Sequence, residues 1–148
     1  RIFFGDYDEN VQASTTGFRL NVSTGVISFA CKGQNGTNTS FSMTLPASPL
    51  NNWKTIALIV DRGTSIKLID EVGTSQTSTD TNIINYVTGS NTMRFGAQVE
   101  TADVGVESVE ADLLNLAIFN AALSDSDINT ILAKAAEDLT NFGRSYAY

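Results

Sequence analysis

The most suggestive chemical pair in the sequence is Glu110 and Asp112, two carboxylates separated by one residue. Side chains two residues apart lie on the same face of a β-strand, so a strand here would bring both carboxyl groups together. Retaining glycosidases need two carboxyl groups about 5 Å apart, one as nucleophile and one as acid. The alternative is that both residues face solvent on a strand that precedes a core strand.

A second cluster, Asp6-Tyr7-Asp8-Glu9-Asn10, is dense in oxygen ligands. Calcium is a hard cation that binds carboxylates and carbonyls, so Asp6 and Asp8 are the candidate metal ligands. The run continues with Val11 and lacks the central Gly and the closing Glu of a calcium loop. We therefore expect that the protein needs no cofactor, with Ca²⁺ at this cluster as the alternative.

Two groups combine an aromatic ring with amide side chains, as sugar-binding sites do. The C–H face of a sugar stacks on the ring, while Asn and Asp side chains bind its hydroxyl groups. The first group is Tyr7 with Asn10, and the second is Asn85 and Tyr86 with Asn91. These five residues are the candidate ligand-binding residues.

Composition excludes several classes of function. The 148 residues contain no His, which removes His-dependent triads and His-ligated zinc from this sequence. Nine basic and 16 acidic residues give a net charge of −7, which disfavours nucleic acids and anionic membrane surfaces as partners. The longest aliphatic run, residues 56–60, is too short to insert across a bilayer. The single Cys31 lies in an alternating run, which indicates an inert core thiol.

The chain reads as short β-type runs separated by turn residues up to about Phe119. Trp53 to Asp61 is the most apolar run, which predicts a buried central strand. The polar stretch from Gly73 to Asn82 is either an edge strand or a loop. The other expected strands are residues 17–22, 26–29, 39–45, 65–70, 93–96 and 113–119.

After Phe119 the apolar period changes from two residues to that of a helix. Ser124 provides an N-cap followed by acids in the first turn, which predicts a helix from Asp125 to about Asp138. Gly143 should end it, and Tyr146 and Tyr148 should dock on the body. Strands first and one helix last predict a single all-β domain over residues 1–148, an antiparallel two-sheet sandwich.

Two segments resemble the laminin G-like domains of the concanavalin A-like lectin and glucanase superfamily. NWKTIALIVD (52–61) followed by IKLIDEV (66–72) is similar to the hairpin of that family, with Glu71 where Gly is usual. MRFG (93–96) and DLLNLAIFNAALSDSDI (112–128) are similar to its closing strand and helix entry. The resemblance implies a jelly-roll sandwich with one C-terminal helix.

The resemblance also bears on catalysis and on the sheet edges. Glucanases of the superfamily carry Glu-x-Asp-x-x-Glu, whereas here Asn115 stands at the position of the acid, which disfavours catalysis.

Family members usually have one or two further strands before the segment that matches Phe3-Phe4-Gly5. We expect that edge to be covered by a removed piece, by the tail from Asn141 to Tyr148, or by a neighbouring subunit.

The resulting functional hypothesis is a recognition or adhesion module without catalytic residues. Its partner would be a glycan or a surface protein, and it would act outside the cell or on the surface of a virus particle. The alternative is a structural protein of a virus or phage particle, as a surface, decoration or fibre component that contacts copies of itself or neighbouring subunits. A glycoside hydrolase is the third, disfavoured hypothesis.

Overall fold

The structure is a computed structural model that describes residues 2–6, 16–23, 25–45, 53–89, 94–95 and 116–144. The described strands are β1 (Ile2–Gly5), β2 (Phe18–Ser23), β3 (Val26–Lys32), β4 (Asn38–Thr44), β5 (Ile56–Asp61), β6 (Ser65–Asp70), β7 (Ser75–Ser78) and β8 (Arg94–Phe95). The described helices are α1 (Thr81–Ile84) and α2 (Asp125–Asn141). Neither helix is long and apolar enough to span a membrane.

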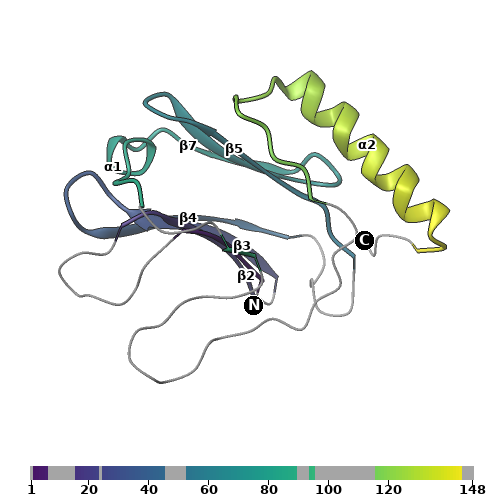
Figure 1. Cartoon of the computed structure of the whole chain (residues 1–148), viewed down its shortest axis with the longest axis horizontal. Helices are drawn as coiled ribbons and strands as arrows, with labels where there is room; N and C mark the ends of the chain where they lie inside the picture. Colours follow the sequence, from purple (N-terminus) through teal and green to yellow (C-terminus); the bar gives the residue numbers. More distant parts are fainter. Residues whose placement is uncertain are drawn as a thin grey trace.

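The described strands form two antiparallel sheets. One has the order β4-β3-β2-β1-β8 and the other has the order β5-β6-β7. Figure 1 shows the sheets as two layers, with α2 on the outer side of the three-stranded sheet and α1 at one end between the layers. The predicted mostly-β fold with two antiparallel sheets and a C-terminal helix is confirmed at this level.

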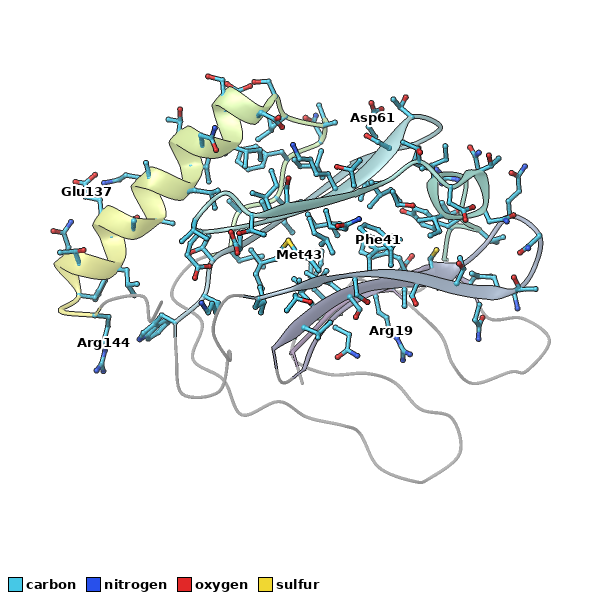
Figure 2. All side chains as sticks on the ribbon, turned by 180° about the vertical axis from the view of Figure 1, so that it is seen from behind. Arg19, Phe41, Met43, Asp61, Glu137 and Arg144 are labelled. Atoms are coloured by element: carbon cyan, nitrogen blue, oxygen red, sulfur yellow. The ribbon has the colours of Figure 1, made fainter. Side chains whose placement is uncertain are left out.

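Alternation along the strands builds the core between the sheets. In β3 every second residue is buried, and Ile27, Phe29 and Cys31 are 0% exposed. Phe41 and Met43 of β4 point into the same space in Figure 2. Burial of each large apolar side chain contributes about 1.5–3 kcal/mol to the free energy of unfolding. The buried core residues are Phe18, Ile27, Phe29, Cys31, Met43, Leu45, Ile66, Leu68, Ile83, Ile84 and Tyr86.

The three-stranded sheet is covered on both faces. Successive residues of β6 point to opposite sides, so Leu68 enters the core between the sheets and Ile69 faces α2. Ile128 and Leu132 of α2 pack against Ile69 and complete a second apolar cluster. The three-stranded sheet is therefore a middle layer between the five-stranded sheet and the helix.

The predicted start of α2 is confirmed in atomic detail. Ser124 Oγ accepts a hydrogen bond from Asp127 N at 3.2 Å, and Asp127 Oδ2 accepts one from Ser124 N at 3.3 Å. These reciprocal bonds satisfy backbone donors that the first turn leaves open. The helix extends three residues beyond the predicted Asp138 and ends before Gly143, whose φ of +67° suits glycine.

The prediction of a buried central strand at Trp53 to Asp61 is wrong. The strand begins at Ile56, it is the outer member of the described three-stranded sheet, and none of its residues is fully buried. The strand is apolar along its length because both of its faces are covered by other parts of the protein. Ile56, Leu58 and Val60 pack against the core between the sheets, while Ala57 and Ile59 pack against the cluster with α2.

Three further segments refine the predicted strand list. Residues 116–119 are not a strand, and Ile118 and Phe119 are 70% and 52% exposed, so the strand predicted over 113–119 is wrong in its described part. The stretch from Gly73 to Asn82 contains the edge strand β7, followed by the unpredicted α1. Strand β1 pairs with β8 on its second side, at Phe4 and Gly5, so this edge is covered there by another strand of the same chain and not by one of the three expected covers. The predicted docking of Tyr146 and Tyr148 lies outside the described residues.

Candidate functional site

One end of the sandwich is closed by residues 80–89, which we call the closing segment. It is bonded to the five-stranded sheet, where Val87 N donates to Lys32 O at 2.8 Å and Gln34 N donates to Asn82 O at 3.1 Å. It is also bonded to the β5–β6 turn, where Gly63 N donates to Ile84 O at 3.2 Å. The turns of the two sheets are therefore fixed beside each other, with α1 between them (Figure 1).

Local sequence explains why the closing segment folds as it does. Asp80 Oδ1 accepts a hydrogen bond from Asn82 N at 2.8 Å and so caps α1. Ile83 and Ile84 then enter the core, which anchors this short helix. At the other end of α1, Asn85 Nδ2 donates to Thr81 O at 3.1 Å. Asn85, one of the predicted ligand-binding residues, is half-buried beside the β5–β6 turn.

Tyr86 lies in the core and not on an exposed platform. Its ring is in edge-to-face contact with Phe18 and Phe29, at centroid distances of 5.7 and 5.8 Å, and the residue is only 6% exposed. Burial raises the pKa of the Tyr86 phenol above its ordinary value, an effect that Arg62 opposes and Asp6 strengthens. Stacking on a sugar needs an exposed ring, so in this structure Tyr86 is a core aromatic.

Arg62 lies over Tyr86 at the β5–β6 turn. Arg62 Cζ is 4.8 Å from the centroid of the Tyr86 ring, which is a cation–π distance. Arg62 Nη2 also donates a hydrogen bond to Tyr86 O at 2.9 Å. Two contacts therefore fix the guanidinium group, although the residue is exposed.

Asp6, one of the two candidate metal ligands, comes to the same end of the sandwich. Its Oδ1 accepts a hydrogen bond from Phe18 N at 2.9 Å. Its carboxylate occupies the space beside Gly17 and Gly89, where a Cβ on either glycine would collide with it. The structure thus brings Asp6 of the first predicted cluster to the closing segment, which carries Asn85 and Tyr86 of the second.

The surface at this end is rich in hydrogen-bonding groups. We call these residues the polar rim: Gln34, Asn35, Asp61, Arg62, Thr64, Asp80, Thr81, Asn82, Asn85 and Thr88. Within the described turns and closing segment, Val87 is the one large apolar residue that is exposed, at 38%. Amide, hydroxyl, carboxylate and guanidinium groups together can donate to and accept from the hydroxyl groups of a ligand.

Comparisons with protein-family models, with curated proteins and with solved structures found no match to this chain. The likeness to laminin G-like domains thus rests on the sequence segments alone.

The described residues contain no group of three or more His, Cys, Asp or Glu side chains that could hold a metal ion. Asp8, the second candidate metal ligand, lies outside them, so the calcium alternative stays a prediction.

Cys31 is buried, and burial, with a smaller effect of Asp80, raises the pKa of its thiol to about 12. The expected inert core thiol agrees with this placement.

Several predicted site residues lie outside the described part of the chain. They are Tyr7, Asn10 and Asn91 of the ligand-binding set, and Glu110, Asp112 and Asn115 of the carboxylate motif. Arg62 is not among the site residues predicted from the sequence. No local signal marks this residue, because its partner Tyr86 is 24 positions away.

Proposed function

We propose that this chain is a non-catalytic recognition module that binds a glycan through the polar rim. We propose further that its two sheets belong to a concanavalin A-like jelly roll. Such a module would act outside a cell or on the surface of a virus particle, where glycans are displayed. The observation that carries the proposal is the composition of the polar rim.

The polar rim favours a glycan over a protein as partner. Energetic centres of protein interfaces are well-packed aromatic and apolar side chains surrounded by a polar border. The described rim instead offers hydrogen-bonding groups, with Val87 as its one exposed large apolar side chain. Glycans present many hydroxyl groups that such residues can bind. The order of Glu110, Asp112 and Asn115 further supports a role without catalysis, because Asn115 cannot act as a carboxylic acid.

The polar rim is also held in place before any ligand arrives. The closing segment is bonded to both sheets, and the Asn35 side chain accepts hydrogen bonds from Thr37 N at 3.0 Å and Thr37 Oγ1 at 2.7 Å. A surface that is ordered in advance loses less conformational entropy on binding. Weak individual hydrogen bonds to hydroxyl groups can then add up to useful affinity.

A glycan array followed by titration calorimetry tests the proposal. The rim variant combines Gln34→Ala and Asp61→Ala, which removes one amide from the β3–β4 turn and one carboxylate from the end of β5 without removing a described side-chain hydrogen bond. The matched control combines Asn129→Ala and Glu137→Ala on the exposed side of α2, and Figure 2 shows Glu137 at the opposite end of the molecule from Asp61. We expect glycan binding to weaken in the rim variant and to persist in the control. A chain that binds no glycan, or equal weakening in both variants, would contradict the proposal.

A further inference from the structure

The geometry points to Arg62 as a carboxylate-binding residue, and we infer that the glycan bound at the polar rim is an acidic one. This inference rests on the proposed function and names the class of its ligand. The ligand carboxylate would accept hydrogen bonds from the Arg62 guanidinium group, while neighbouring hydroxyl groups of the sugar would meet Asn85 and Thr64.

The guanidinium group of Arg62 is fixed in position by two contacts. It lies 4.8 Å from the Tyr86 ring centroid, and Nη2 donates to Tyr86 O at 2.9 Å. Tyr86 is itself held by Phe18 and Phe29 in the core. Arg62 thus rests on a rigid support, so little side-chain entropy remains to be lost when a ligand binds.

Most N–H donors of Arg62 remain for a ligand. An arginine side chain has five N–H donors, and one of them is used in the described bond to Tyr86 O. Among the described residues no carboxylate forms an ion pair with Arg62. By contrast, each of Lys54, Lys67 and Lys134 forms an ion pair, with its Nζ 2.7 to 3.0 Å from a carboxylate oxygen.

The shape of the Arg62 guanidinium group favours a carboxylate. The guanidinium group is planar, and its N–H donors lie in that plane as a rigid fork. That fork matches the two oxygens of a carboxylate and forms strong, charge-assisted bonds with it. A neutral sugar offers hydroxyl groups alone and does not form this charge-assisted pair. The fixed, exposed Arg62 therefore favours a uronic acid or another carboxylated sugar.

The primary test uses the unchanged chain. An array carries acidic oligosaccharides, each printed beside its methyl ester, and selected pairs are titrated by calorimetry. We expect the esters to bind roughly 10- to 100-fold more weakly than the acids, as loss of a charge-assisted bidentate contact implies. This comparison needs no mutation, so it remains decisive even where an Arg62 variant unfolds.

Variants then assign the effect to Arg62. Arg62→Gln should weaken binding of the acid to the level of the ester, and Arg62→Lys, which keeps the charge but not the fork, should weaken it roughly 10-fold. Arg144→Gln is the matched control for charge, and Figure 2 shows Arg144 at the opposite end of the molecule from Asp61, the neighbour of Arg62. We expect it to bind the acid as the unchanged chain does.

The outcomes separate this inference from the proposed function. Equal binding of acids and esters, with glycans still bound, overturns the inference and leaves the proposed function standing. Equal weakening by Arg62→Gln and Arg144→Gln also overturns the inference, because net charge alone would then explain the preference. Absence of all glycan binding overturns both.

Discussion

Two hydrogen bonds connect Asp6 and Phe18. Asp6 N donates to Phe18 O at 3.1 Å, and Phe18 N donates to Asp6 Oδ1 at 2.9 Å. The side chain of Asp6 thus continues the pairing of β1 with β2 beyond the last strand residue. Because the same carboxylate packs against Gly89, this contact also ties the first strand to the closing segment.

Gly89→Ala should destabilise the protein through Asp6. A Cβ at Gly89 would collide with the Asp6 carboxylate and lie 3.0 Å from Asp6 O. We expect the free energy of unfolding in urea to fall by about 1–3 kcal/mol, the usual range for overpacking. The double variant Asp6→Ala/Gly89→Ala should lose less than the sum of the two single variants, since Asp6→Ala vacates the space. Full stability of Gly89→Ala would contradict the described packing.

Lys54→Met should be strongly destabilising because it breaks a buried ion pair. Lys54 Nζ lies 2.7 Å from Glu71 Oε1, and the two side chains are 5% and 0% exposed. An uncompensated buried charge costs about 3–5 kcal/mol, measurable as a lower urea midpoint. The double variant Lys54→Met/Glu71→Leu should recover most of this loss. Lys134→Met, which breaks an exposed pair with Glu137, is the control and should change stability little.

Stability should fall as the pH rises above about 9, in part through Cys31. The thiol has an ordinary pKa of 9.0, which burial raises to about 12 in the folded chain. Between these values the unfolded thiol releases its proton while the folded thiol keeps it, so alkaline pH favours the unfolded state. The free energy of unfolding in urea, measured between about pH 8 and about pH 11, should fall less steeply with pH in Cys31→Ala than in the unchanged chain. Identical slopes, or rapid alkylation of Cys31 in the native protein, would speak against a buried thiol.

Ser124→Ala should weaken the start of α2. The substitution removes the acceptor for Asp127 N and the 2.6 Å bond from Ser124 Oγ to Asp127 Oδ2. Loss of an N-cap hydroxyl typically costs about 1 kcal/mol, and urea unfolding followed by circular dichroism can resolve this difference. Ser126→Ala, in the exposed first turn, is the matched control and should be close to neutral. If both variants behaved alike, the capping arrangement would not be the stabilising feature.

Local patterns were sufficient to predict most of the described strands. In β3 and β4 every second side chain enters the core, so apolar residues recur in the sequence with a period of two. Asn35-Gly36 reverses the chain between them, with Gly36 at φ +80°, and Ser124 sets the start of α2. These features depend on neighbours within a few residues, which is why the sequence reveals them.

Strand order and the candidate site depended on contacts between distant residues. Hydropathy could not distinguish a central strand from β5, which is the outer strand of the described three-stranded sheet and is covered on both faces, because both produce a continuous apolar run. Tyr86 has the same residue type whether it is an exposed platform or a core aromatic, and only its packing on Phe18 and Phe29 decides between them. Sequence composition determined the acidic, His-free chemistry of this protein. The tertiary structure placed Arg62 over Tyr86, because the hydrogen bonds of the closing segment bring the two together across 24 positions of chain.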